Sequence, residues 1–159
     1  MDVNALLAQV IGEAQAIGIP LSKHIFPEVR LNTRAVARFG CCIRRGETCC
    51  IEVSARLLEA GELAVRETLA HEILHTCWGC RDHGPRWKSY AERMNAAYGY
   101  RIRRTGTWEA LGLPDEKPVN HLLVCEKCGL EIPRTKASTL VRRPERYRCR
   151  CGGKLILKY

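Results

Sequence analysis

Two histidines four residues apart, with a glutamate directly after the first, form the most chemically informative pattern in the sequence. The pattern is His71-Glu72-Ile73-Leu74-His75, or H-E-x-x-H. In a helix, side chains four residues apart share one face at about 6 Å, so the two imidazoles can bind one Zn²⁺. The glutamate lies one step round the helix, where a carboxylate can reach a metal-bound water without being a ligand. The pattern predicts a hydrolytic zinc site, although two unrelated histidines on a helix would read the same.

A catalytic zinc site needs a third protein ligand and an open position for water. Our candidate is His83, which lies eight residues after His75 and directly before Gly84-Pro85, a typical helix start. Other residues in reach are Cys77, Cys80, Asp82 and Glu92. Cys77 follows His75 by two residues and should point away from the ligand face. Cys80 is less easily excluded, and Glu92 on the following helix could also bind, but His83 remains our candidate.

A second group of metal-ligand residues lies near the C-terminus. It consists of a C-x-x-C pair and a C-x-C pair, each followed by glycine: Cys125, Cys128, Cys149 and Cys151. Four thiolates suit a tetrahedral structural Zn²⁺, whose binding free energy would stabilise a segment too small and polar for a core of its own. The second pair is one residue shorter than usual. His121, four residues before the first cysteine, is the alternative ligand.

Four further cysteines lie in two adjacent pairs, Cys41-Cys42 and Cys49-Cys50. Neighbours in a strand face opposite sides of a sheet, which is the wrong geometry for one four-thiolate site. Across a turn at Arg44–Glu47, Cys42 should pair with Cys49 and Cys41 with Cys50. We interpret them as small apolar residues, with redox chemistry or an extra metal as the alternative.

The elements that must position these groups can be outlined from the apolar spacing. A helix capped by Asp2 is expected over residues 3–17, and a longer helix over 62–78 carries the histidine pattern. Another helix should run from Pro85 to Gly99, and residues 100–118 are expected to be a connector.

Between the first two helices the sequence texture is that of strands. Alternation at 29–32 and apolar runs at 36–43 and 48–53 predict a small antiparallel sheet. Trp78 and Trp87 fit the apolar periodicity of their helices, so both are expected in the core.

Taken together, these residues resemble the SprT-like metallopeptidases, whose active-site pattern is H-E-x-x-H followed by H-G and an aromatic residue. The matching stretches are Glu67–His75 and His83–Trp87. The resemblance extends upstream through 38–41, 51–54 and 57–58, and downstream to the cysteine segment 147–155.

The resemblance implies an α+β fold with a zincin-like helical core and a small antiparallel sheet, plus a C-terminal zinc ribbon. The metallopeptidase domain would span 1–113 and the ribbon 114–159. It implies His71, His75 and His83 as ligands of a catalytic zinc, and Glu72 as the catalytic acid/base. It also supports the four C-terminal cysteines as ligands of one structural zinc. The oxyanion stabiliser stays open among Tyr90, Tyr98 and Arg86.

Charge is distributed unevenly along the chain, whose formal net charge is +9. Residues 1–83 hold 9 basic and 10 acidic side chains, whereas residues 84–159 hold 17 and 7. A basic half of this kind predicts a polyanionic partner, most often nucleic acid. The candidate nucleic-acid-binding residues are Arg101, Arg103, Arg104, Lys127, Arg142 and Arg143.

Composition narrows the class of protein. The 159 residues are 46% hydrophobic and 27% charged, which excludes a disordered tail or a fibrous repeat. No apolar run approaches the ~20 residues of a membrane span, and the N-terminus has no basic leader. We therefore expect a monomer without membrane contact in the reducing cytoplasm, where it can associate with DNA.

The predicted function is that of a zinc-dependent endopeptidase for DNA-associated proteins, working by Glu72-assisted attack of zinc-bound water on the peptide bond. The alternative is a nucleic-acid-binding zinc regulatory protein without proteolytic activity. A zinc hydrolase acting on something other than a peptide is a weaker third option.

Overall fold

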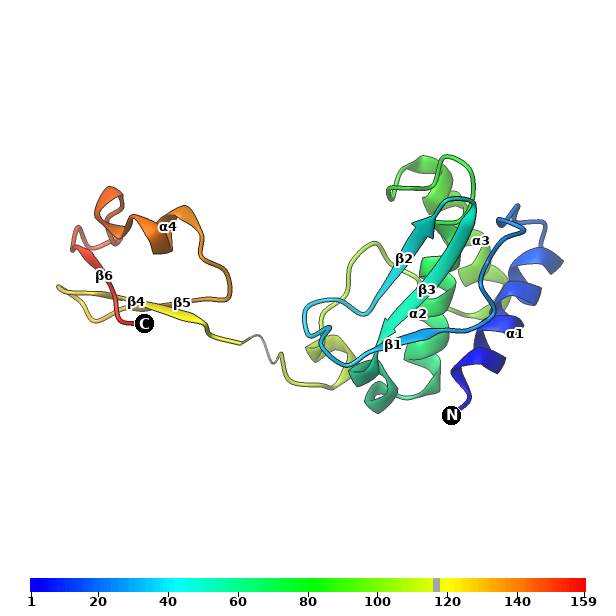
Figure 1. The fold of residues 1–159 in the computed structure, drawn as a ribbon, viewed down its shortest axis with the longest axis horizontal. Coiled ribbons are helices and arrows are strands. Elements are labelled where there is room, and N and C mark those ends of the chain that lie inside the picture. Colours follow the sequence, from blue (N-terminus) through cyan, green and yellow to red (C-terminus); the bar gives the residue numbers. More distant parts are fainter. Residues whose placement is uncertain (116–117) are drawn as a thin grey trace. The chain divides into compact units, whose positions relative to one another are not determined.

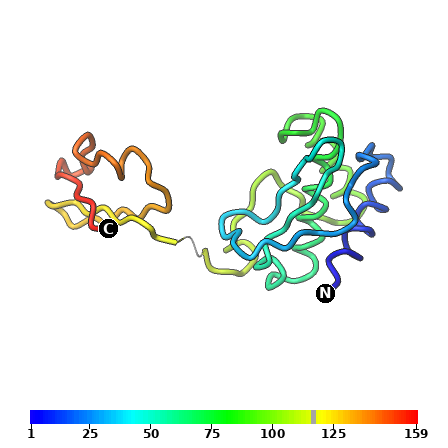
Figure 2. Tube along the Cα trace, viewed as in Figure 1, coloured from blue at the N-terminus to red at the C-terminus, as the bar shows by residue number. Residues whose placement is uncertain are grey.

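The computed structural model describes residues 1–115 and 118–159 (Figures 1 and 2). The chain divides into two compact units, Met1–Asp115 and Glu116–Tyr159. The connector expected over 100–118 includes residues 116–117, which lie outside the described residues. None of the described helices is long and apolar enough to cross a membrane. The fold is α+β, as predicted.

Three helices form one layer of the first unit. They are α1 (Val3–Ala16), α2 (Glu62–Leu74) and α3 (Pro85–Tyr98). The Asp2 carboxylate caps α1 by accepting from the amides of Asn4 and Ala5 at 3.0 and 3.1 Å. α3 ends at Gly99, whose φ of +69° suits a residue without Cβ. α2 packs against α1, α3 and the sheet, so it is the central element of the unit (Figure 1).

The helix that carries the histidine pattern ends at Leu74, four residues earlier than the sequence predicted. His75 is its C-cap, and the Thr76 hydroxyl bonds the Ile73 carbonyl at 2.6 Å, which satisfies one of the last helical acceptors. The chain then turns at Gly79, where φ is +72°. The prediction that Trp78 is a core residue is therefore wrong: it follows the helix and is 82% exposed.

A three-stranded sheet lies across α2 (Figure 1). Its strands are β1 (Arg30–Asn32), β2 (Gly40–Arg45) and β3 (Thr48–Ser54), in the order β1-β3-β2. The β2–β3 hairpin is antiparallel as expected, while β1 runs parallel to β3, so the sheet is mixed. A 3₁₀ segment (Ala55–Ala60) then leads into α2.

The hairpin register differs from the one expected for the paired cysteines. Cys42 lies opposite Ile51 and Cys41 opposite Glu52, and not opposite Cys49 and Cys50. The reason is a two-residue turn: Arg45 pairs with Thr48, and Gly46 takes φ +60°, which suits the first central position of a II′ turn. All ten cysteines of the chain are free.

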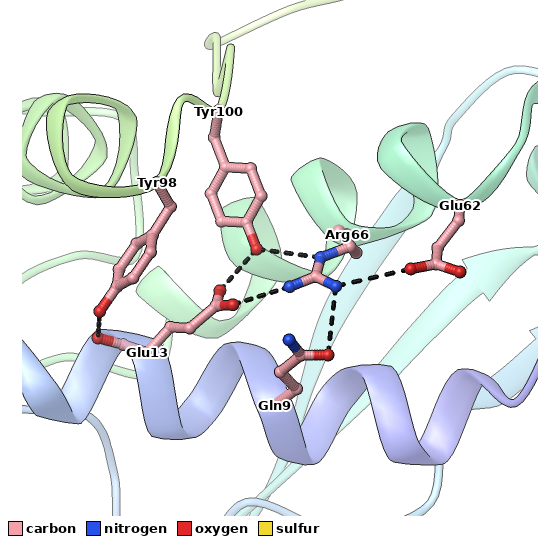
Figure 3. Close-up of polar contacts among 6 residues, drawn as sticks. All are labelled: Gln9, Glu13, Glu62, Arg66, Tyr98 and Tyr100. Carbon is pink, nitrogen blue, oxygen red and sulfur yellow. Dashed lines mark hydrogen bonds and ion pairs between the residues drawn. The ribbon is translucent and has the colours of Figure 1, made fainter.

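A network of polar side chains joins α1 to α2 and to the segment after α3 (Figure 3). The Arg66 guanidinium donates to Glu13 at 2.7 Å and to the Tyr100 hydroxyl at 3.2 Å, and that hydroxyl donates to Glu13 at 2.5 Å. The Tyr98 hydroxyl donates to the Glu13 carbonyl at 2.8 Å. The network holds the chain after Gly99 on the side of α2 that leads to the histidines.

The second unit is a smaller sheet with short helical turns. Its strands are β4 (His121–Cys125), β5 (Glu131–Arg134) and β6 (Leu155–Leu157), which are antiparallel in the order β5-β4-β6. A one-turn helix, α4 (Thr139–Arg142), lies between β5 and the Cys149–Cys151 pair. Its buried hydrophobic cluster consists of Leu123, Cys125, Val141, Cys149 and Leu155. Two of these five are cysteines, so little apolar area stabilises the unit.

Candidate metal centres

The imidazoles of the three predicted histidines meet at one point. The Nε2 atom of His71 lies 3.3 Å from that of His75 and 2.9 Å from that of His83. One ring nitrogen from each lies within 4.8 Å of the others. The end of α2 supplies the first two rings, and the loop before α3 returns the third to them.

Backbone carbonyls fix the orientation of two of these rings. The carbonyl of Arg103 lies 2.9 Å from Nδ1 of His71, and the carbonyl of Cys80 lies 2.7 Å from Nδ1 of His75. A carbonyl can only accept, so Nδ1 carries the proton in both rings and Nε2 presents a lone pair. Unprotonated Nε2 atoms gathered at one point are the donor set that a divalent metal such as zinc requires. The residues present therefore fit the metal.

The environment of His71 and His83 favours their neutral forms. Burial, followed by the neighbouring His75 and His83, lowers the pKa of His71 to about 4. Burial also lowers the pKa of His83. Neutral imidazole is the form that ligates metal.

The indole ring of Trp87 packs against all three imidazole rings. Its ring centroid lies 4.7, 5.7 and 4.6 Å from those of His71, His75 and His83. It is 2% exposed, so the prediction of a core position is confirmed. The sequence did not lead us to expect that Trp87 contacts all three imidazoles. The available signal was that Trp87 lies four residues after His83.

The other candidates for the third ligand lie outside this group. The thiols of Cys77 and Cys80 are buried outside the histidine group, and the carbonyl of Cys80 contacts Nδ1 of His75. The Asp82 carboxylate accepts from the Gly84 amide at 3.1 Å, which shapes the loop before α3. Glu92 is exposed on α3.

Glu72 is buried against the first residues of β2. A Cβ on Gly40 would lie 2.9 Å from Cγ of Glu72, so glycine permits this close approach. Burial raises the pKa of Glu72 to about 7, while a hydrogen bond from the backbone of Cys42 and the charge of Arg38 oppose the rise. A carboxylate held next to the histidines by helix and strand can act as a proton acceptor.

The structure gives two of the candidate oxyanion stabilisers other contacts. The Tyr98 hydroxyl is bound to α1, as described above. The Arg86 guanidinium lies 4.6 Å above the exposed Trp78 ring and donates to the Trp78 carbonyl at 3.1 Å. Tyr90 is half-buried on α3.

The four C-terminal cysteines form the second cluster. Their sulfurs lie within 4.8 Å of one another, with Cys125 and Cys151 at 3.5 Å and Cys128 and Cys149 at 3.6 Å. Backbone N–H groups of Cys128 and Lys127 lower the pKa of Cys125 to about 6, while hydrogen bonds with the neighbouring thiols raise the pKa of Cys128 to about 12. This donor set fits a tetrahedral metal site. The alternative ligand, His121, begins β4 and is outside the group.

Glycines explain how the short C-x-C pair reaches the cluster. The amide of Gly152 donates to the Cys149 carbonyl at 2.8 Å, which closes a turn over Cys149–Gly152, and Gly152 has a φ of +82°. A Cβ on Gly153 would lie 2.5 Å from the sulfur of Cys125. The missing residue of the knuckle is thus compensated by the glycine pair behind it.

All six candidate nucleic-acid-binding residues are exposed. In the first unit these are Arg101, Arg103 and Arg104, and in the second they are Lys127, Arg142 and Arg143. The Arg101 side chain is 72% exposed and lies 3.9 Å from the Glu67 carboxylate. The backbone of Arg103 has a separate part in orienting His71.

Comparison with known proteins places this geometry in a family. No curated protein matches the chain. The model of the SprT-like family matches residues 21–106, which include the three converging histidines and Glu72. The match ends before the four-cysteine unit begins. With more than half of its residues matched, the chain belongs to the SprT-like family.

Proposed function

We propose that this protein is a zinc-dependent endopeptidase whose catalytic metal is held by His71, His75 and His83. The observation that carries the proposal is the convergence of ring nitrogens from three histidines at the end of the helix that also carries the buried Glu72. Membership of the SprT-like family supports it, and so does a zincin-like arrangement in which a helix end supplies two ligands and the acid/base.

The reaction follows from the residues around the site. Zinc, when bound, would supply a Lewis acid for a carbonyl and acidify a bound water. Glu72 accepts a proton at its carboxylate and returns it to the leaving amine. The buried ring of Trp87 packs against the histidine rings.

The sheet offers a place for an extended substrate. β2 has one partner strand among the strands that the structure describes, so its other edge has free backbone groups. Gly40, the first residue of β2, lies against the Glu72 side chain, which brings this strand to the proposed acid/base. An extended peptide can add to such an edge as a further strand, and we propose this as the mode of substrate binding.

Glu72→Gln tests the mechanism directly. The amide keeps the shape of the side chain but cannot accept the proton, so we expect cleavage to fall by about 10²–10⁴-fold with the metal content unchanged. Metal content is read by mass spectrometry of the native protein, and cleavage on a denatured protein substrate. His75→Ala is the control that should lose both metal and activity. Unchanged turnover in Glu72→Gln would refute the proposal.

We propose further that the natural substrates are proteins associated with DNA, and that the four-cysteine unit holds a structural zinc. The support is charge: residues 84–159 hold 17 basic and 7 acidic side chains, and the six candidate residues are exposed. Such contacts to phosphates confer affinity without sequence preference and weaken with salt. Ten free cysteines support a reducing compartment, and we propose the cytoplasm.

The test is cleavage of a basic DNA-binding protein with no DNA, single-stranded DNA or duplex DNA. We expect stimulation by DNA that requires Glu72 and declines with salt. Replacing Arg142 and Arg143 together by alanine should reduce the stimulation. The exposed pair Lys23 and Arg34, which is not on β2, is the matched control that should not. DNA binding without Glu72-dependent cleavage in any arm would favour the regulatory alternative.

A further inference from the structure

The carbonyl that orients His71 belongs to a segment without regular secondary structure. Residues 100–103 follow α3 and form neither helix nor strand. The Arg103 carbonyl accepts from Nδ1 of His71 at 2.9 Å. The ring orientation of a ligand therefore depends on where this segment lies, and ladder hydrogen bonds do not determine that.

Two side chains hold the backbone immediately before this carbonyl. Asn95, on α3, binds both backbone groups of Ile102: its Oδ1 accepts from the amide at 2.8 Å and its Nδ2 donates to the carbonyl at 3.2 Å. Glu67, on α2, accepts from the Arg101 amide at 2.8 Å. The Ile102 side chain is 6% exposed, so apolar packing holds the same residue from its other side.

The placement of these contacts relates them to the metal site. Glu67 lies one helical turn before His71 on the same face of α2. The segment thus runs along α2 from Glu67 to His71, with Asn95 closing it from α3. One peptide unit separates the Asn95 contacts at Ile102 from the carbonyl of Arg103.

We infer that Asn95 and Glu67 are positioning residues for the metal centre. They place the Arg103 carbonyl, which sets the tautomer and the ring angle of His71 and so directs its Nε2 lone pair. Partners in the outer shell of a metal site typically change its affinity by about 10–100-fold when they are removed. The inference rests on the proposed function, because it assumes a metal at the three histidines.

The experiment measures metal affinity in the full chain. Cobalt(II) is the probe, because sites of imidazole and sites of thiolate absorb differently and can be titrated separately against a chelator. Asn95→Ala should weaken the histidine site by about tenfold, the lower end of the outer-shell range, since it acts through a neighbouring residue. The four-thiolate site should be unchanged and is the internal reference.

Two further variants separate positioning from a loss of stability. Asn4→Ala removes an asparagine bond to the Val29 amide of 2.8 Å in the same unit, so it should lower stability without changing cobalt affinity. Glu67→Ala should weaken the histidine site, whereas Glu67→Gln retains the acceptor oxygen and should restore it. If Asn95→Ala does not fold, this second pair decides the question.

The outcomes distinguish the two claims. Wild-type affinity in both Asn95→Ala and Glu67→Ala would overturn the positioning role and leave the metal site standing. Equal weakening by Asn4→Ala would also overturn it, because the effect would then be a general loss of stability. A wild-type chain that binds cobalt only at the thiolates would overturn the proposed function itself.

Discussion

Close packing around Glu72 makes Gly40 sensitive to a single added methyl group. Its Cβ would lie 2.9 Å from Cγ of Glu72 and 2.9 Å from Cγ2 of Thr68, both on the rigid helix α2. Contacts this short force one of the two elements to shift. Glu72, the proposed acid/base, is therefore the group that a larger residue at position 40 would displace.

We predict that Gly40→Ala lowers cleavage by at least about tenfold and destabilises the unit by about 1–3 kcal/mol through overpacking, with the metal retained. Activity, metal content and urea unfolding measure these three quantities. Gly12→Ala is the control, since its Cβ meets nothing within 4 Å and should stabilise α1 by about 0.5–1 kcal/mol. Full activity in Gly40→Ala would show that Glu72 can move without consequence.

At the scale of elements, the glycine-rich turn after Cys149 decides whether the small sheet can hold a metal. A Cβ on Gly153 would lie 2.5 Å from the Cys125 sulfur and 2.7 Å from Cβ of Lys127. We expect Gly153→Ala to weaken cobalt binding at the thiolates by tenfold or more, read from the thiolate absorption. Ser138→Ala, an exposed position in the same unit, should bind as the wild type does. Retained affinity in Gly153→Ala would contradict the close approach.

The contact between α1 and α2 depends on Arg66, whose partners are shown in Figure 3. The side chains of Arg66 and Glu13 are only 18% and 15% exposed, so removing the cation leaves a largely buried carboxylate. Arg66→Met should lower the free energy of unfolding by about 2–3 kcal/mol, less than for a fully buried pair. Urea denaturation measures it, with exposed Arg34→Met as a control within about 0.5 kcal/mol of wild type. A change as small as that of the control would mean that the network adds no stability.

At the scale of the whole molecule, the two units differ in what stabilises them. The first has an extensive buried core that includes Leu7, Ile51, Leu69 and Trp87. The second has five buried hydrophobic residues, two of which are candidate ligands. We therefore expect metal binding to supply much of the folding free energy of the second unit but not of the first.

Removal of metal should unfold the units selectively. With a strong chelator, we expect rapid proteolysis within residues 118–159, while the first unit stays resistant because its core does not depend on the metal. Mass spectrometry of the fragments locates the cuts, and added zinc should restore protection. Protection of the second unit without metal would mean that its small core suffices.

Local patterns were sufficient for a large part of the candidate site. Four-residue spacing on an apolar helix predicted His71 and His75, and the helix start at Pro85 predicted the return of His83. The cap at Asp2 and the stop at Gly99 were also predicted, because caps depend on a few neighbouring residues. The cysteine cluster followed from knuckle spacing in the same way.

Contacts between distant segments were not predictable from these patterns. The carbonyls of Arg103 and Cys80 orient the ligands, yet a backbone carbonyl has no sequence signature. Apolar periodicity predicted that α2 continues to Trp78, but the helix ends at Leu74 and Trp78 is exposed. The strand pattern likewise gave no sign of the two-residue turn at Gly46, which sets the hairpin register.

The sequence by itself therefore determined which side chains can bind metal and transfer a proton, since those properties belong to residue types and short spacings. Only the tertiary structure decided which ring nitrogen of the histidines faces the site. It also decided that Glu72 packs closely against Gly40 and that Asn95 hydrogen-bonds the backbone of Ile102. These contacts depend on how segments far apart in the chain pack together. Backbone groups of those segments set the orientation of the side chains, and the residue types next to them in the sequence do not reveal it.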